Sequence, residues 1–287
     1  MSAAPWPAPA KLNLFLHVLG HRADGYHEIQ TVFQLIGLAD SLAIAPRADG
    51  AIRRLEGPRE VPEANDLCVR AARRLQAEAG VRQGADIRLT KRIPVQGGLG
   101  GGSSDAATTL VALNEIWGLG LEPARLATLG RELGADVPFF VHGQNAWGEG
   151  VGERLTPLEL PPRYFAVIYP GIGVRTAEVF QAPELTRNSA KTTIRGFLKA
   201  GGRNDCEAVV AARHPPVAEA LAWLRQRGEA ALTGTGSCVF AAYAEERSAR
   251  AALAGLPAGW SGFVARGLDR SPLQERLAAE RSCEGGP

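Results

Sequence analysis

A glycine run at residues 97–102, "GGLGGG", restricts what this chain can fold into more than any other segment. Five of these six residues are glycine, and a stretch rich in helix formers follows directly. Glycine loses more conformational freedom on folding than any other residue, so such a run is costly unless it has a role. Two roles are open: a flexible linker, or a loop whose backbone needs conformations and close approaches that a Cβ would prevent.

The segments on either side of the run favour the second role. Residues 85–94 have the pattern of a strand, and residues 103–117 that of a helix which Ser103 or Ser104 can cap. A helix N-terminus exposes unpaired N–H groups and a partial positive charge, and the glycine N–H groups add to them. We therefore predict that the loop binds phosphate.

Neither common phosphate-loop fingerprint fits the glycine run. The Walker A pattern GxxxxGK[ST] would align Gly97 with Gly102, but Ser103 stands where lysine is required. The pattern GxGxxG also fails, because no Gly-x-Gly of this run has a glycine three residues further on. A lysine that neutralises phosphate charge must therefore come from elsewhere in the chain.

The composition indicates a globular protein of one large or two ordinary domains. The chain has 287 residues, of which 45% are hydrophobic and 22% charged, and a net charge of +2 with no basic cluster that would predict a nucleic-acid partner. The four widely spaced cysteines form no CxxC and predict reduced thiols. We recognise neither a signal peptide nor an apolar run long enough to span a membrane, so we expect a cytoplasmic protein without a membrane partner.

Hydrophobic periodicity predicts an α+β protein. A turn containing Asp24 and Gly25 is expected to join the first two strands into a hairpin. The expected strands cover residues 11–20, 31–46, 85–94, 164–169, 230–243 and 259–268. The expected helices cover residues 66–79, 103–117, 122–133, 215–227 and 244–256. Residues 135–143 and 145–158 are expected to be irregular or extended, and we place two domains at residues 1–157 and 158–287.

Three segments in order resemble the GHMP kinase superfamily, which includes galactokinase, homoserine kinase and mevalonate kinase. They are "PAKLNLFL" at residues 9–16, "PVQGGLGGGSSDAA" at residues 94–107 and "LTGTGSCVF" at residues 232–240. The segments "HRADGYHEIQTVFQ" and "GADVPFF" resemble the branch that acts on a cytidine-diphosphate alcohol. The resemblance runs from about Pro7 to Leu273, and the tail after Leu273 looks dispensable.

The resemblance implies both a fold and an activity. The fold would combine an N-terminal domain like the second domain of ribosomal protein S5 with a C-terminal ferredoxin-like domain, and the substrates would meet in the cleft between them. The activity would be the phosphorylation, by ATP with Mg²⁺, of the 2-hydroxyl of 4-diphosphocytidyl-2-C-methyl-D-erythritol in non-mevalonate isoprenoid synthesis. The expected partners are these small molecules, and the chain is expected to be a monomer or a weak homodimer.

Two residues are candidates for catalysis. Asp136 precedes Pro138 and is equally suited, from the residues alone, to accept a proton or to cap a turn after Gly134. The resemblance implies that it is the catalytic base. Lys11 is one of only four lysines among 32 basic residues, and the resemblance places it beside Asp136, where it would stabilise charge on the transferring group. The alternative is an exposed lysine at the beginning of the first strand.

The resemblance also implies binding residues. Those expected to bind ATP are Asn65, Lys91, Pro94, Val95, Gln96, Gly97, Gly98, Leu99, Gly100, Gly101, Gly102, Ser103 and Ser104. Those expected to bind the substrate are Asn13, Tyr26, His27, Asp136, Thr176 and Phe180. In this set Tyr26 and Phe180 would stack on the base and His27 would contact cytosine, whereas the alternative is that both aromatic residues belong to the core. No set of metal ligands is predicted, although Ser104 or Asp105 is placed to approach Mg²⁺.

Two other functions stay open. A GHMP kinase of the homoserine or mevalonate type would share the motifs, but "RADGYHEI" argues against it because those substrates have no base to stack. A regulatory module that binds nucleotide without catalysis would need only the loop, and the presence of both Lys11 and Asp136 argues against it.

Overall fold

The structure, a computed structural model, describes residues 4–284 and has an α+β fold, as predicted. Its strands are β1 (Trp6–His21), β2 (His27–Arg47), β3 (Ile52–Glu56), β4 (Gly84–Thr90), β5 (Ala146–Gly150), β6 (Arg154–Pro157), β7 (Tyr164–Tyr169), β8 (Ala230–Leu232), β9 (Val239–Tyr243) and β10 (Ser261–Leu268). Its α-helices are α1 (Leu67–Ala79), α2 (Gly101–Ile116), α3 (Pro123–Arg131), α4 (Val137–His142), α5 (Thr176–Phe180), α6 (Ile194–Ala200), α7 (Glu207–Arg213), α8 (Pro215–Arg225), α9 (Glu246–Ala252) and α10 (Pro272–Glu284). A short 3₁₀ helix covers Glu63–Asn65.

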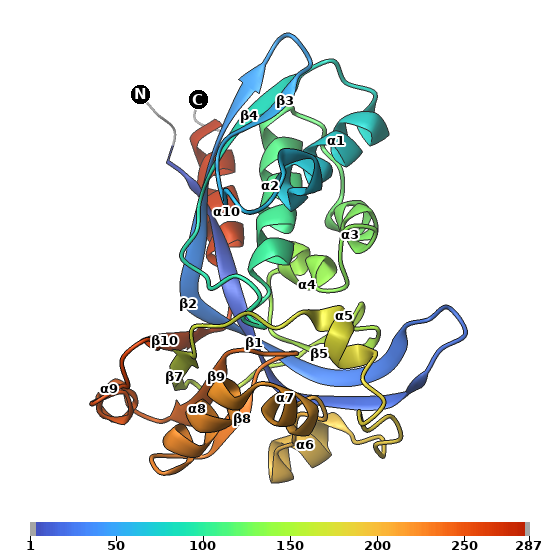
Figure 1. The fold of residues 1–287 in the computed structure, drawn as a ribbon. Helices are drawn as coiled ribbons and strands as arrows, with labels where there is room; N and C mark the ends of the chain where they lie inside the picture. The colour runs from blue at the N-terminus through green and yellow to red at the C-terminus, as the bar shows by residue number, and fades with distance from the viewer. Residues whose placement is uncertain (1–3, 285–287) are drawn as a thin grey trace.

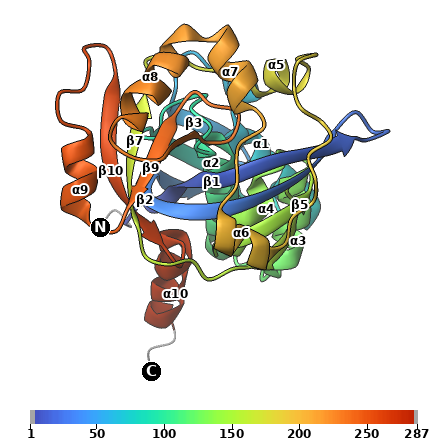
Figure 2. The same cartoon turned by 90° about the horizontal axis from the view of Figure 1, so that it is seen from below.

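The long antiparallel hairpin of β1 and β2 runs through the whole molecule. Its two strands pair from Trp6 opposite Leu42 to His21 opposite His27, and the predicted turn at Gly25 joins them with a φ of 85°. Figure 1 shows the hairpin passing through both halves, and Figure 2 shows the strands side by side with their turn projecting from the body of the protein. The hairpin therefore contributes residues to both halves of the molecule.

The strands join into one sheet system of ten strands among the described residues. Its order is β3-β4-β2-β10-β7-β9-β8, with β1 and β5 also paired to β2 and β6 paired to β5. Strand β10 pairs with β2 at Gly267 and Leu268 and with β7 along its earlier residues. Because β10 pairs with both, it links the sheet of the N-terminal half to that of the C-terminal half.

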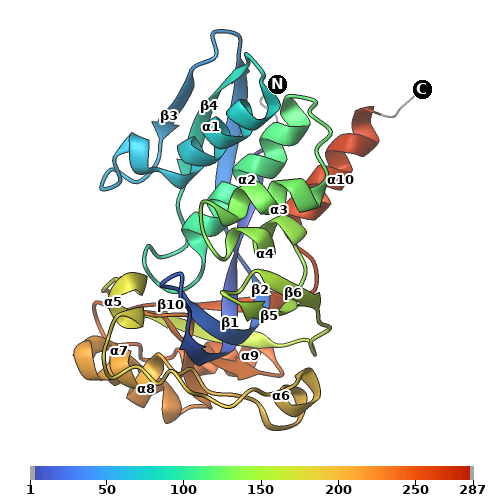
Figure 3. The same ribbon diagram turned by 90° about the vertical axis from the view of Figure 1, so that its right-hand side faces the viewer.

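The helices cover the sheet in two groups with separate hydrophobic cores. Helices α1 to α4 and α10 lie together in the upper half of Figures 1 and 3, and α5 to α9 lie in the lower half. The upper core includes the fully buried Leu75, Leu110 and Phe139, and the lower core includes the fully buried Ala220 and Leu224. A boundary near residue 157 stays a prediction, but residues 272–284 pack on the N-terminal group, although the predicted division gave them to the C-terminal domain.

Three local predictions were wrong. Helix α2 begins at Gly101 with Gly100 as its N-cap, so Ser103 and Ser104 lie inside the first turn and cap nothing. Residues 137–142 form helix α4, not an irregular or extended segment, because Pro138 fits the first helical turn. Strand β1 begins at Trp6, so Lys11 lies within the strand and not at its beginning.

Residues 274–284, part of the tail that looked dispensable, belong to the fold. They continue α10, whose Leu273 is fully buried and whose Leu277 packs against the N-terminal core. The Arg276 guanidinium lies over the Trp6 ring at 4.8 Å, and Arg281 pairs with Glu115 of α2. Among the described residues, no helix has the length and apolar character needed to cross a membrane.

Candidate active site

The glycine loop, residues 94–102, is held against a second glycine-containing segment, residues 232–238. The N–H of Cys238 donates to the Gly97 carbonyl at 3.0 Å, and the N–H of Ser237 donates to the Gln96 carbonyl at 3.2 Å. Gly98 has a φ of 75°, and a Cβ placed there would lie 2.2 Å from the Thr233 carbonyl oxygen. The loop is therefore fixed in place, and the flexible-linker alternative is wrong.

The end of the loop leaves free backbone donors at the N-terminus of α2. Gly100 has a φ of 74° and no side chain, so nothing caps the helix. Within the described residues, the N–H groups of Gly101, Gly102 and Ser103 donate no hydrogen bond, since the first bond of the helix is made by Ser104. These N–H groups and the helix dipole together form an anion site.

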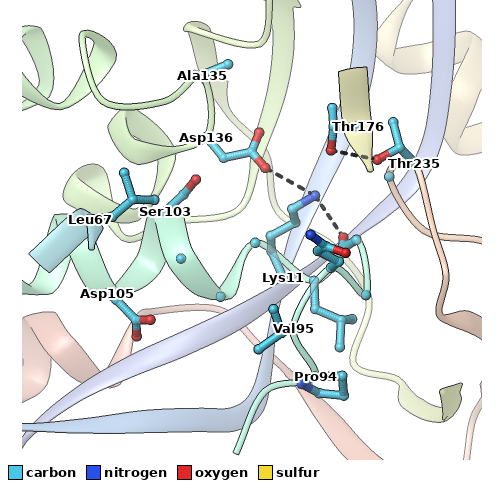
Figure 4. Close-up of a pocket in the computed structure, with 18 of the residues that line it drawn as sticks. Lys11, Leu67, Pro94, Val95, Ser103, Asp105, Ala135, Asp136, Thr176 and Thr235 are labelled. Carbon is cyan, nitrogen blue, oxygen red and sulfur yellow. Dashed lines mark hydrogen bonds and ion pairs between the residues drawn. The ribbon is translucent and has the colours of Figure 1, made fainter. Parts of the chain in front are cut away.

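Lys11 lies under the loop and faces Asp136. Its side chain is buried, and its Nζ lies 3.3 Å from Asp136 Oδ2 and 3.1 Å from the Gly98 carbonyl oxygen (Figure 4). Lys11 Nζ also donates to Asn13 Oδ1. A Cβ on Gly100 would lie 3.0 Å from Lys11 Cε, so glycine at 100 gives the lysine room to cross the loop. The alternative of an exposed lysine is therefore wrong.

Asp136 occupies the N-cap position of α4 but does not cap it. Its side chain makes no hydrogen bond to the helix N–H groups and is 29% exposed, pointing toward Lys11 (Figure 4). The alternative of a turn-capping aspartate therefore has no support in the structure. The carboxylate remains available to a substrate.

A cavity of about 580 Å³ lies beside the loop and contains the Lys11–Asp136 pair. Every residue that was expected to bind ATP lines it except Ser104, whose side chain is fully buried. Its lining also includes the apolar side chains of Pro58, Val61 and Leu89. The cavity thus combines the glycine loop with both apolar and charged side chains.

Lys91 at the end of β4 forms a buried ion triad with two aspartates that the sequence did not single out for this role. Lys91 Nζ lies 2.7 Å from Asp105 Oδ2 of α2 and also pairs with Asp40 of β2. The other oxygen of Asp40 accepts from the N–H groups of Arg92 (2.5 Å) and Ile93 (2.8 Å), which lead into the loop. The triad therefore links the residues just before the glycine loop to helix α2, which follows the loop.

Burial and the charges of the three groups together set the protonation of this triad. Burial raises the pKa of Asp105 to about 7, an effect that Lys91 opposes and Asp40 strengthens. Burial also acts to lower the pKa of Lys91, but Asp105 and Asp40 outweigh it, so that this pKa is raised. Asp105 Oδ1 is buried and has no hydrogen-bond partner among residues 4–284. No local signal in the sequence marks Asp40, which reaches the loop only through the pairing of β2 with β4.

A second cavity, of about 810 Å³, opens near the turn of the hairpin. It is lined by Tyr26, His27 and Phe180, and it shares Thr176 and Phe180 with the first cavity. Phe180 stacks on the His27 ring with centroids 5.1 Å apart, while Tyr26 is 61% exposed. The alternative of a core position is therefore wrong for Tyr26. Phe180 is partly buried and packs against the core of the C-terminal half while it also lines both cavities.

The second glycine segment supplies site residues that the sequence-based list omitted. Thr235 and Gly234 line the first cavity, and the Thr235 hydroxyl hydrogen-bonds to that of Thr176 at 3.0 Å (Figure 4). Thr233 Oγ1 accepts from the backbone N–H of Asn13 at 2.9 Å. The sequence signal for these residues is the segment "LTGTGSCVF", which also carries part of the family resemblance.

Comparison with known proteins gives the family. The family profile "GHMP kinases N terminal domain" matches residues 66–144, and "GHMP kinases C terminal" matches residues 184–262. A 4-diphosphocytidyl-2-C-methyl-D-erythritol kinase from Alkalilimnicola ehrlichii is 58% identical over 96% of this chain and 95% of its own length. One from Halorhodospira halophila is 55% identical over 95% of this chain and 96% of its own length.

Solved structures agree with the sequence relatives. A crystal structure of a 4-(cytidine 5'-diphospho)-2C-methyl-D-erythritol kinase superposes with a TM-score of 0.80 and 36% identity, covering 92% of this chain and 98% of that one. A homoserine kinase from Cytophaga hutchinsonii superposes with a TM-score of 0.73 over 94% of this chain and 96% of that one, but its 16% identity speaks for the fold alone. The chain belongs to the GHMP kinases and, among them, to the family of the 4-diphosphocytidyl-2-C-methyl-D-erythritol kinases.

Proposed function

We propose that this protein transfers the γ-phosphoryl group of ATP to the 2-hydroxyl of 4-diphosphocytidyl-2-C-methyl-D-erythritol, a step of non-mevalonate isoprenoid synthesis. The single observation that carries the proposal is the Lys11–Asp136 pair, which lies in the cavity that also contains the N-terminus of α2. The names of the relatives supply the substrate, and the two adjoining cavities supply space for it beside ATP.

ATP would occupy the first cavity. Its phosphates would accept hydrogen bonds from the N–H groups of Gly101, Gly102 and Ser103, where the helix dipole also favours negative charge. The purine would lie near the apolar side chains of Leu67 and Leu89. With the purine there, the γ-phosphate would lie toward Lys11 and Asp136.

Asp136 and Lys11 would divide the chemistry between them. Asp136 would accept the proton of the substrate hydroxyl as the oxygen attacks the γ-phosphorus and the bond to the β-phosphate oxygen breaks, giving ADP and a phosphate monoester. Lys11 would stabilise negative charge on the transferring group, because its ammonium is held in place by Gly98 and Asn13 before the substrate arrives.

The alcohol substrate would extend from the pair into the second cavity. Its cytosine would reach the aromatic side chains of Tyr26 and Phe180, where stacking on one ring stabilises a base by about 1–3 kcal/mol. Thr176 and Phe180 line both cavities and would lie near the diphosphate and the base, respectively.

We expect Mg²⁺ to accompany ATP, but the described residues do not form a site for it. They contain no cluster of three His, Cys, Asp or Glu side chains that could hold a metal. Ser104 does not line the cavity, and Asp105 is paired with Lys91 and lies apart from the Lys11–Asp136 pair (Figure 4). When bound, Mg²⁺ would neutralise phosphate charge, and its ligands would come mainly from ATP itself.

The test is a comparison of acceptors. The purified protein is incubated with Mg²⁺ and ATP plus 4-diphosphocytidyl-2-C-methyl-D-erythritol, homoserine or mevalonate, and phosphorus NMR follows ADP and any new phosphate monoester. We expect turnover with the first acceptor only. Turnover with homoserine or mevalonate alone would overturn the substrate, and ATP binding without any turnover would favour the regulatory alternative. The cytoplasmic location and the oligomeric state stay predictions from the sequence.

A further inference from the structure

Arg187 is tied to the wall of the second cavity by a set of hydrogen bonds that the proposed reaction does not use. It lies between α5 and α6, and its Nε donates to His27 Nε2 at 3.0 Å. The terminal guanidinium nitrogens donate to the carbonyl oxygens of Phe180 (2.9 Å), Ala182 (2.6 Å) and Leu185 (3.1 Å). One side chain therefore fixes both the imidazole of His27 and the segment that carries Phe180.

The contact with His27 determines where the imidazole proton lies. An arginine side chain is always protonated and has only donors, so His27 Nε2 must be the acceptor. A neutral imidazole has one donor nitrogen and one acceptor nitrogen, and the proton therefore lies on Nδ1. Burial lowers the pKa of His27, and the charges of Arg187 and His21 lower it further, so the neutral ring is favoured.

The protonated nitrogen is free to meet a ligand. Within residues 4–284, His27 Nδ1 has no hydrogen-bond partner, and it is not among the buried polar atoms that lack one. The His27 ring lines the second cavity and stacks on Phe180 with an interplanar angle of 28°. His21 meets the same ring edge-on, with centroids 4.9 Å apart. The ring is thus held on two sides while Nδ1 stays accessible.

We propose that Arg187 is a positioning residue that holds His27 in its Nδ1–H tautomer, so that the cavity offers a hydrogen-bond donor, and not an acceptor, to the base of the substrate. Cytosine carries acceptors at N3 and O2, whereas N3 of uracil carries a hydrogen. A donor facing N3 therefore selects cytosine, because uracil would leave two donors facing each other. This selection rests on the proposed function, but the tautomer does not.

The tautomer is measured on the free protein. Two-bond ¹H–¹⁵N correlation spectra of the imidazoles distinguish a protonated nitrogen from a bare one, and His27→Gln assigns its signals. We expect the bare nitrogen of His27 to be Nε2, and a bare Nδ1 would overturn the proposal. In Arg187→Met the signals are expected to shift toward the Nε2–H form. The matched control is Arg213→Met, which removes a partly exposed arginine that pairs with Glu184 and leaves His27 untouched.

Base selection is measured by calorimetric binding of cytidine 5'-diphosphate and uridine 5'-diphosphate. We expect the parent and Arg213→Met to bind the cytosine ligand at least about tenfold more tightly, and Arg187→Met to lose most of this ratio while its KM for ATP stays the same. If Arg187→Met fails to fold, Arg187→Lys replaces it, because lysine keeps the charge but lacks the planar set of guanidinium donors. The tautomer measured in the parent tests the proposal without either variant.

The His27 tautomer and the selection of cytosine can be contradicted by different results. If the tautomer is as proposed but the binding ratio does not change in Arg187→Met, the role in selection is wrong. If neither diphosphate binds to the parent while ATP does, the proposed substrate is wrong. The tautomer of His27 is then judged only from its NMR spectrum. An unchanged tautomer in Arg187→Met would overturn the positioning role of Arg187.

Discussion

Lys11 Nζ lies 3.3 Å from Asp136 Oδ2, although one residue lies within the first strand and the other immediately before a short helix. The pair forms because β1 passes beneath the glycine loop, where Gly98 accepts a hydrogen bond from Lys11. The same loop leads into α2, whose first residues line the cavity and carry the free N–H groups. One stretch of glycine thus positions both the phosphate site and the lysine.

Replacing Lys11 with methionine is expected to lower kcat without abolishing ATP binding. Methionine fills a similar volume but has no charge, so the stabilisation of the transferring phosphoryl group is lost, typically about 10²–10³-fold in kcat. Steady-state kinetics with ATP and the alcohol measure the change. Lys191→Met is the control, because Lys191 is exposed and has no ion pair with any of residues 4–284. A Lys11→Met protein with parental kcat would remove Lys11 from the mechanism.

Gly98→Ala is expected to damage the site far more than Gly118→Ala. Both glycines have positive φ, 75° and 64°, so both substitutions strain the backbone. At Gly98 the new Cβ would lie 2.2 Å from the Thr233 carbonyl oxygen, whereas at Gly118 no atom of residues 4–284 lies within 4 Å of it. Equilibrium dialysis with ATP should show weaker binding for Gly98→Ala alone. Equal effects of the two substitutions would mean that the contact between the loops is unimportant.

The buried triad predicts a pH dependence of stability. The pKa of Asp105 in the folded protein is raised to about 7, above that of an unfolded aspartate, so the folded state keeps a proton that the unfolded chain has released. The contribution to stability is therefore fully present below about pH 4 and is lost as the pH rises to about 7.

Asp105→Asn tests this dependence because asparagine does not titrate. Urea unfolding at pH 5 and pH 8 should show that the parent loses more stability between the two values than the variant, by on the order of 1–2 kcal/mol. Asp269→Asn, an exposed carboxylate, should behave as the parent does. A parent and an Asp105→Asn variant with parallel pH profiles would contradict the raised pKa.

Removing residues 274–287 is expected to destabilise the protein. The truncation takes away Leu277, which packs on the N-terminal core, and Arg276, which covers the Trp6 ring. Loss of one buried leucine side chain typically costs about 2–5 kcal/mol, and Leu277 is only partly buried, so about 2 kcal/mol is expected. Thermal unfolding measures the loss. An unchanged Tm would restore the view that this tail is dispensable.

The sequence predicted those parts of the fold that local patterns encode. The hairpin turn at Gly25, helix α1 and its end at Gly80, and the strand–loop–helix around the glycine run all have local signals, and all are present. The start of α2 was misplaced because serine is a favoured cap residue, whereas here Gly100 provides the left-handed turn. Local propensity favours serine as a cap and does not indicate that the backbone at Gly100 is left-handed.

The parts of the site that the sequence missed depend on contacts distant in the chain. Asp40 reaches Lys91 only because β2 and β4 pair, and Thr235 reaches Thr176 only because the second glycine segment folds onto the loop. Arg187 meets His27 across a larger separation, of 160 residues. No periodicity or spacing within one segment reports such contacts, so a structure is needed to find them.

The role of Asp136 as the catalytic base is tested by Asp136→Asn, which keeps the size of the side chain but cannot accept the proton. The rate of ADP and phosphate-monoester formation with 4-diphosphocytidyl-2-C-methyl-D-erythritol is measured by phosphorus NMR for the parent, Asp136→Asn and the exposed control Asp269→Asn. We expect turnover by the parent and the control, and a loss of about 10²–10⁴-fold in kcat for Asp136→Asn with ATP binding retained. Turnover by Asp136→Asn at the parental rate would contradict this role.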